Sequence, residues 1–288
     1  MSSTVLFLPE LILIASILSI PAIYIATNST KSYSICSNIS LFVSLLIVIL
    51  FWYSPEQVSF DKSSSSYVIY DHFVINDFSQ LFKVIFLMSA LAVSVISSSY
   101  FKEDEPHQAE YYVLLLSSAL GMLITASAND FLTIFVGIEI SAFSSYGLVA
   151  FRKTDDKSAE AGAKYLLIGA FSSALTLYGI SLLYALTGSV TFEGVNAFLT
   201  GIENGVIDGD FTELVFISSL FIIAGLGFKI AVVPFHAWAP DVYEGAPTPV
   251  TALLAAASKA MGFVALFKVF IFTLEPFSEE WKLVFGII

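Results

Sequence analysis

Two lysines lie within long apolar stretches of the sequence, and an acidic residue lies within a third. The lysines are Lys229 and Lys259, and the acid is Glu139, in the middle of Phe131–Ala150. A charge near the centre of a bilayer costs about 2.5–3.5 kcal/mol on insertion scales, and charges retained there usually mark proton or ion pathways. The three residues therefore predict a buried proton or ion pathway in which Glu139 is the acidic partner of the lysines.

The composition is that of a polytopic membrane protein. Of the 288 residues, 57% are hydrophobic and 12% are charged, whereas soluble domains carry about 25% charged residues. The net charge is −12 and there is no basic patch, which argues against nucleic acid as a partner. A single cysteine, Cys36, excludes an intrachain disulfide, and no cysteine and histidine cluster has metal-ligand spacing.

Eight stretches are long and apolar enough to cross a bilayer as helices. Lipid admits only helices or closed barrels, and these runs are too long and too uniformly apolar for barrel strands. We therefore predict an all-α, polytopic membrane helix bundle. The expected spans are Val5–Ala26, Ile35–Tyr53, Phe78–Tyr100, Tyr111–Ala128, Phe131–Phe151, Lys164–Thr187, Leu214–Phe235 and Val250–Leu274.

The loops between alternate spans differ in positive charge. One set of loops holds Lys31, Lys102, Arg152, Lys153 and Lys157. The other set holds Lys62. Because cytoplasmic loops carry the excess of lysine and arginine, the first set is expected inside and the N-terminus outside. The apolar run Trp281–Ile288 is too short to span, so we expect the chain to be cut within a ninth helix.

The seventh span is predicted to be broken. Pro234 follows Lys229 by five residues, and proline removes a helix hydrogen bond and clashes with the preceding turn. Interrupted helices beside a charge are typical of transporter sites. The segment that follows contains Pro247 and Pro249, for which we expect structural roles in an ordered turn with short helical pieces, and Asp241 is expected to cap one piece.

One long motif carries a family resemblance. From Lys229 the sequence reads KIAVVPFHAWAPDVYEGAPTPVTA, and ASKA follows around Lys259. This stretch resembles the antiporter-like membrane subunits of respiratory complex I, and its sequence after Pro240 is similar to that of the subunit N branch. The order of spans agrees across essentially the whole chain. The alternative is a subunit of an Mrp-type cation/proton antiporter, whose sequences usually differ after this proline and aspartate.

The resemblance implies a particular fold and a proton relay. The family has about fourteen helices with two inverted five-helix repeats, of which this chain would hold the first. Residues 1–108 would then form helices 1–3, residues 109–275 the proton-translocating repeat of helices 4–8, and residues 276–288 the start of a truncated helix 9. In the implied relay Glu139 pairs with Lys229, and Lys259 passes protons toward the second half. Lys164 and His236 are further candidates.

The resemblance also implies what surrounds the chain. No redox centre is expected in the chain itself, whereas the parent complex would use NADH, FMN, iron–sulfur clusters and quinone. Quinone reduction elsewhere would drive proton transfer, which makes the chain a subunit of a translocase. The implied partners are membrane subunits of the A, H, J, K, L and M types, within a lipid bilayer. A bacterial or archaeal cell membrane is expected, with an organelle membrane as the alternative.

Other charged residues have plainer interpretations. Lys83 and Lys268 lie near span ends, where we expect them to snorkel toward the headgroups. Lys164 either snorkels in the same way or assists proton uptake. His236 either assists proton movement, since its side chain titrates near neutral pH, or pins the loop by a hydrogen bond. His72 is expected to be exposed to solvent.

Overall fold

The computed structural model describes residues 6–27, 30–53, 67–69, 72–102, 106–207, 209 and 211–287. Eight helices in these ranges are long and apolar enough to cross a membrane. The predicted helix bundle is therefore confirmed, with one small antiparallel hairpin added to it. Lys62, on which part of the expected orientation depends, lies outside the described residues.

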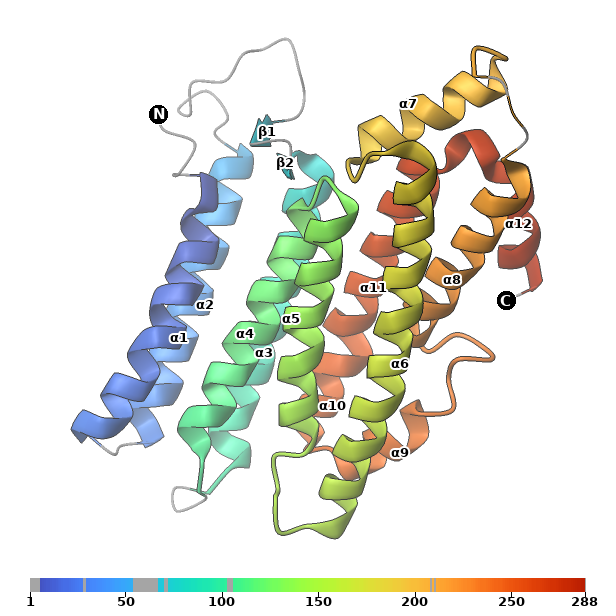
Figure 1. The fold of residues 1–288 in the computed structure, drawn as a ribbon. Helices are drawn as coiled ribbons and strands as arrows, with labels where there is room; N and C mark the ends of the chain where they lie inside the picture. The colour runs from blue at the N-terminus through green and yellow to red at the C-terminus, as the bar shows by residue number, and fades with distance from the viewer. Residues whose placement is uncertain are drawn as a thin grey trace.

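The membrane helices lie side by side (Figure 1). The first seven spans are α1 (Leu8–Thr27), α2 (Thr30–Tyr53), α3 (Asp77–Tyr100), α4 (Gln108–Ser127), α5 (Phe131–Val149), α6 (Asp156–Thr187) and α8 (Thr212–Ile230). The eighth is a continuous helix made of α10 (Thr248–Leu253), the π-helical η2 (Leu254–Ser258), α11 (Lys259–Leu266) and the π-helical η3 (Phe267–Thr273). The remaining elements are β1 (Tyr67–Ile69), β2 (Phe73–Ile75), α7 (Phe192–Glu203), α9 (Ala239–Gly245), η4 (Glu275–Phe277) and α12 (Ser278–Ile287).

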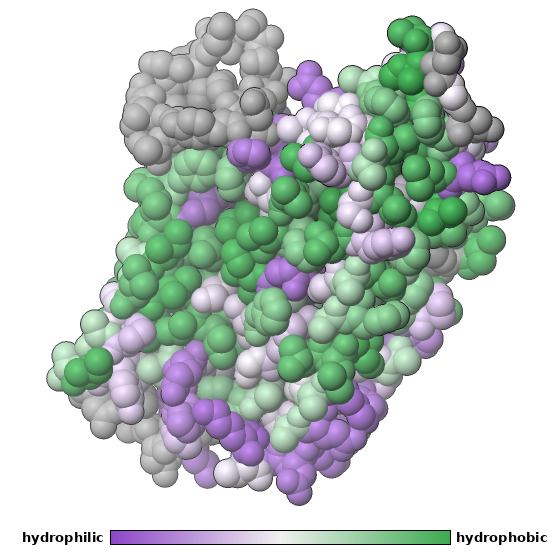
Figure 2. All heavy atoms as spheres, viewed as in Figure 1, coloured by the Kyte–Doolittle hydropathy of each residue, from purple (hydrophilic) through white to green (hydrophobic). Residues whose placement is uncertain are grey.

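The two ends of the bundle carry different elements. Helix α7 and the β1–β2 hairpin lie at the top in Figure 1, and α9 lies at the bottom; these are termed the α7 end and the α9 end. Hydrophobic side chains cover the middle of the face drawn in Figure 2, and hydrophilic ones gather at the α9 end. That distribution is what a bilayer around the middle of the bundle requires.

Helices α6 and α8 pack closely because α8 has a glycine where they meet. A Cβ atom at Gly225 would lie 1.9 Å from Thr176 Oγ1 and 2.7 Å from the Ser172 carbonyl oxygen. The Ser172 hydroxyl donates a 2.7 Å hydrogen bond to the Gly225 carbonyl. Small residues and interhelical hydrogen bonds of this kind are what hold helices together in lipid. They place the last turn of α8 against α6.

Helix α8 ends five residues before the predicted end of the seventh span. It stops at Ile230, and Ala231 has a left-handed φ of 56°. Pro234 explains the position, because a proline ring clashes with the carbonyl four residues before it, which here belongs to Ile230. The residue before a proline also disfavours helical geometry. The break is confirmed, and the chain crosses to the short helix α9 through turns.

Two other elements differ from the sequence prediction. Helix α6 begins at Asp156 instead of Lys164, and Asp155 caps it by accepting a 3.0 Å hydrogen bond from the Lys157 amide. Its first two turns contain charged residues, so the prediction from apolar residues alone started the span too late. Helix α7 was not predicted, because it buries only one face, through Phe192, Val195 and Leu199.

Replacing Gly225 by valine should separate α6 from α8. The new side chain would overlap the Thr176 hydroxyl and a backbone carbonyl, and overpacking of this kind destabilises by about 1–3 kcal/mol. We expect a lower melting temperature for the purified membrane assembly. Gly286→Val is the matched control, because nothing in the described chain lies within 4 Å of a Cβ there. Equal stability of the two variants would contradict this account of the α6–α8 contact.

Candidate functional site

Lys229 is buried in the last turn of α8. Its residue is 5% exposed, and its Nζ has no hydrogen-bond partner within the described chain. A buried amine without a partner is unusual, because buried polar groups are hydrogen-bonded in the great majority of cases. The position therefore requires either a water molecule or a charge change, and both are features of proton-transfer sites.

Glu139 faces the same cavity from α5. The cavity has a volume of about 20 Å³ and is lined by residues of α5, α6 and α8, including both Glu139 and Lys229. That volume admits about one water molecule. The Glu139 carboxylate accepts a 2.5 Å hydrogen bond from the Ser173 hydroxyl. The acid and the amine attract each other electrostatically but make no direct hydrogen bond in this conformation.

A backbone carbonyl at the end of α8 finds its hydrogen-bond donors in the chain that follows the helix. The Phe228 carbonyl accepts hydrogen bonds from the Ala231 amide at 3.0 Å and from the Trp238 indole at 3.1 Å. Trp238 is stacked on Tyr165 of α6, with ring centroids 4.7 Å apart. The broken helix is thus held by an aromatic side chain where lipid could not satisfy its carbonyl.

Lys259 lies one helical turn from Gly262, which packs against the last turn of α8, where Lys229 lies. It is half-buried at the junction of η2 and α11. On the same face three residues later, a Cβ at Gly262 would lie 2.5 Å from Ile230 Cγ2 and 3.4 Å from Lys229 Cγ. Residues three apart in a helix share a face. The helix that carries Lys259 therefore packs at Gly262 against the turn that carries Lys229.

Lys259 meets an aromatic ring. Its Nζ is 5.6 Å from the centroid of Tyr243, a cation–π geometry. The Tyr243 hydroxyl is buried without a partner in the described chain, and burial raises its pKa above the ordinary value. Tyr243 is therefore a neutral phenol at physiological pH and offers Lys259 no counter-ion.

Lys164 is paired with acids of α9 and of its own helix α6 and does not point freely to the headgroups. Its Nζ lies 2.5 Å from Asp241 and 2.7 Å from Glu160. Lys157 pairs with Glu244 at 2.7 Å. These exposed pairs join α6 to α9 and surround a charged cavity of about 160 Å³ at the α9 end. Exposed pairs contribute little stability, about 0–1 kcal/mol each.

The remaining predicted residues lie in the connection and in α10. His236 is exposed between α8 and α9, and its carbonyl accepts a 3.0 Å hydrogen bond from the Ala239 amide. The Pro247 carbonyl accepts from the amides of Val250 and Thr251, and Pro249 is buried in the first turn of α10. Proline suits that turn because its missing amide has no partner there.

The expectation that Lys83 and Lys268 snorkel was wrong. Lys83 is 2% exposed and its Nζ lies 2.6 Å from Glu10 of α1. Lys268 is 3% exposed, and its Nζ donates to the carbonyls of Ala126 and Ala128. Both lysines lie close to the ends of their spans, which favoured snorkelling. In the structure neighbouring helices bury them and supply partners for their amines. Glu10, an acid within the first span, was the signal in the sequence that an internal partner existed.

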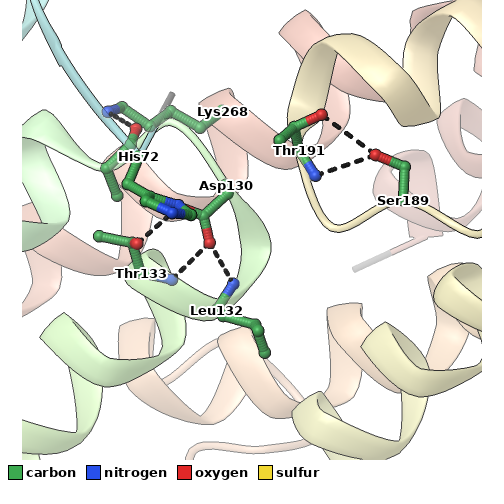
Figure 3. A network of polar contacts seen from close by, with 8 residues as sticks. His72, Asp130, Leu132, Thr133, Ser189, Thr191 and Lys268 are labelled. Carbon is green, nitrogen blue, oxygen red and sulfur yellow. Dashed lines mark hydrogen bonds and ion pairs between the residues drawn. The ribbon is translucent and has the colours of Figure 1, made fainter. Parts of the chain in front are cut away.

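His72 is exposed as predicted, but it also has a buried partner. Its side chain is 55% exposed, and its Nδ1 lies 3.0 Å from Asp130 Oδ2. Asp130 caps α5, accepting from the amides of Leu132 and Thr133 (Figure 3). No group of three or more cysteine, histidine, aspartate or glutamate residues with metal-binding geometry occurs in the described ranges.

Comparison with known proteins identifies the family. The family described as NADH:quinone oxidoreductase/Mrp antiporter, transmembrane, matches residues 128–288. The chain belongs to this family. It is a homologue of the antiporter-like subunit N of NADH-quinone oxidoreductases and a multi-pass membrane protein.

Relatives in bacteria and archaea support the match. NADH-quinone oxidoreductase subunit N of Erythrobacter litoralis is 36% identical over 282 residues, which are 97% of this chain and 54% of the relative. F(420)H(2) dehydrogenase subunit N of Methanosarcina mazei is 36% identical over 283 residues, 97% of this chain and 55% of that protein. A chain of respiratory complex I from Thermus thermophilus with bound aureothin superposes with a TM-score of 0.73 at 27% identity, covering 91% of this chain and 53% of that one. The chain thus spans about half the length of these relatives.

Replacing Trp238 by phenylalanine should loosen the end of α8. The ring stacking on Tyr165 is kept, while the indole donor to the Phe228 carbonyl is lost, for which we expect a loss of about 1 kcal/mol. The purified assembly should melt at a lower temperature. Tyr178→Phe, at an exposed ring of α6, serves as control. A Trp238→Phe protein as stable as the wild type would show that the indole does not hold the break.

Proposed function

We propose that this chain is part of the N-type antiporter-like subunit of a complex I-type quinone oxidoreductase and moves protons through Glu139, Lys229 and Lys259. The observation that carries the proposal is the Lys229 amine, buried without a partner in a cavity that it shares with Glu139. A structural lysine would be expected to have its donors satisfied. An amine that must exchange its proton benefits from an incomplete set of partners.

The distance between Glu139 and Lys229 controls proton release. At an effective dielectric constant of about 20, two unit charges attract by about 4.2 kcal/mol at ~4 Å and by about 2.4 kcal/mol at ~7 Å. The difference changes the proton-release equilibrium about 20-fold. A modest movement of Glu139 away from α8 therefore favours release from Lys229, and approach favours uptake. The single-water cavity supplies the contact between the two groups.

Lys259 receives the proton that Lys229 releases. Support comes from the close packing of Gly262 on Lys229, with Lys259 one helical turn from that glycine, and from the neutral ring of Tyr243, which faces the Lys259 ammonium without forming an ion pair. Uptake occurs at the α9 end, where Lys164 pairs with Asp241 and His236 is exposed in the connection between α8 and α9. Moving a charge against 100 mV costs about 2.3 kcal/mol, so quinone reduction in the parent complex drives the movement.

The repeat organisation and the surroundings complete the proposal. Residues 1–108 form helices 1–3, residues 109–275 form the first of two inverted five-helix repeats, and residues 276–288 begin helix 9. The partners are the A, H, J, K, L and M types of membrane subunit, in a bacterial or archaeal cell membrane. NADH or F(420)H(2), FMN, iron–sulfur clusters and quinone react in other subunits of that complex. The names of the relatives, subunit N of an NADH-quinone oxidoreductase and subunit N of an F(420)H(2) dehydrogenase, support the assignment to such a complex.

The matched family also includes Mrp antiporters, so cation/proton exchange without electron transfer is the second candidate. The similarity to N-type subunits favours the first. Membrane vesicles separate the two functions. Proton uptake that depends on quinone reduction supports the oxidoreductase, whereas sodium-driven proton movement without an electron donor supports the antiporter.

Replacing Lys229 by alanine should stop proton transfer in the assembled complex that contains the complete subunit. The variant removes the proton carrier and leaves Glu139 with its Ser173 hydrogen bond. We expect quinone-linked proton pumping in vesicles to fall at least ten-fold, with electron transfer falling alongside it because the two are coupled. Lys282→Arg, at a lysine that is 57% exposed, is the control. Normal pumping by an assembled Lys229→Ala complex would show that the lysine is structural.

A further inference from the structure

A second group of buried charges lies toward the α7 end of the bundle. It consists of Glu10 near the start of α1, Lys83 in the second turn of α3 and Lys268 near the end of the eighth span. They are 6%, 2% and 3% exposed. Lys83 and Glu10 form an ion pair of 2.6 Å between α3 and α1. Nothing in the relay of Glu139, Lys229 and Lys259 uses these three residues.

Lys268 is held by neutral groups only. Its Nζ donates hydrogen bonds of 2.7 Å to the Ala126 carbonyl and 2.6 Å to the Ala128 carbonyl, at the end of α4. The charge that acts on it from the neighbouring helix is that of Lys83, which has the same sign. No carboxylate in the described chain forms an ion pair with Lys268. The Lys83–Glu10 pair therefore sets how strongly Lys268 is repelled.

The turn that binds Lys268 leads to the surface. Asp130 follows Ala128 by two residues and pairs with His72, whose side chain is 55% exposed. The His72 carbonyl accepts a 2.8 Å hydrogen bond from the Asn129 amide, which fixes the imidazole beside this turn. The Ser127 hydroxyl is buried there without a partner in the described chain. Unsatisfied buried groups of this kind mark sites that take up water.

The two charged groups have the same composition. Each contains one glutamate and two lysines, and the eighth span supplies one lysine to each, Lys259 and Lys268. We propose that Glu10, Lys83 and Lys268 form a second proton-transfer group, which exchanges protons with the α7 side of the membrane through His72. This inference rests on the proposed function, because it extends proton transfer along the eighth span to the other end of the bundle.

The step conserves charge and atoms. While the Lys83–Glu10 pair is intact, the carboxylate offsets the Lys83 charge and Lys268 keeps its proton. When Glu10 is protonated or moves away, the Lys83 charge repels the Lys268 ammonium. An N–H bond of Lys268 then breaks, and water passes the proton to the His72 imidazole, where an N–H bond forms. His72 can carry it because an imidazole ring has two nitrogens, one of which can accept a proton while the other donates one.

Lys268→Arg tests the proposal in the assembled complex. Arginine keeps the charge and the donors to the two carbonyls but does not release a proton. We expect the number of protons pumped per electron pair in vesicles to fall at least two-fold, with the amount of assembled complex unchanged. Lys282→Arg is the matched control. Wild-type pumping by Lys268→Arg would mean that Lys268 only caps α4 and would overturn the proposal.

His72→Ala gives a second readout at a position whose side chain is 55% exposed. Pumping should slow, and imidazole added on the α7 side should restore it, because a soluble base replaces the missing side chain. Absence of both effects contradicts a role for His72. Lys229→Ala, measured in parallel, separates the two proposals. If it abolishes pumping while the Lys268 and His72 variants pump normally, only the second group is rejected; if it pumps normally, the first relay is rejected.

Discussion

A buried lysine amine in an apolar helix bundle is the constraint around which this structure is arranged. Lys229 lies in the last turn of α8 without a hydrogen-bond partner in the described chain, in surroundings where an ammonium is expensive. Three features make the position tolerable: a carboxylate across a small cavity, a helix end held by Trp238, and close packing of α6 on α8 at Gly225. Lys229 thus shares a cavity with the Glu139 carboxylate without forming a hydrogen bond to it.

The end of α8 determines where the proposed proton carrier, the Lys229 amine, lies. Because Pro234 ends α8 at Ile230, the amine sits beside a turn whose carbonyls are satisfied by protein groups. The eighth span packs on this turn at Gly262, which lies one helical turn from Lys259. At the α9 end, ion pairs of Lys157 and Lys164 hold α6 to α9. The same bundle thus has a charged surface at one end and buried charges within.

Much of the fold could be predicted from hydropathy. The contacts of the buried charged residues could be predicted less well. The eight spans and the break near Pro234 follow from local patterns, which report on lipid and on proline geometry. The pairing of Lys83 with Glu10 could not be predicted, because it joins residues 73 positions apart and depends on how α1 packs near α3. The same holds for Lys268, whose acceptors are backbone carbonyls that no sequence pattern marks. The motif at residues 229–252 identified the family, but it did not reveal that Glu139 and Lys229 face one cavity without touching.

A double-mutant cycle on proton pumping tests the central claim that Glu139 and Lys229 act as one unit. Glu139→Gln, Lys229→Met and the double variant would be compared in vesicles that contain the assembled complex, with pumping normalised to the amount of complex. The account predicts strong non-additivity, so that the double variant pumps no less than the worse single variant, because either change already breaks the unit. Independent, additive losses in the double variant would contradict it and would show that the acid and the amine act separately.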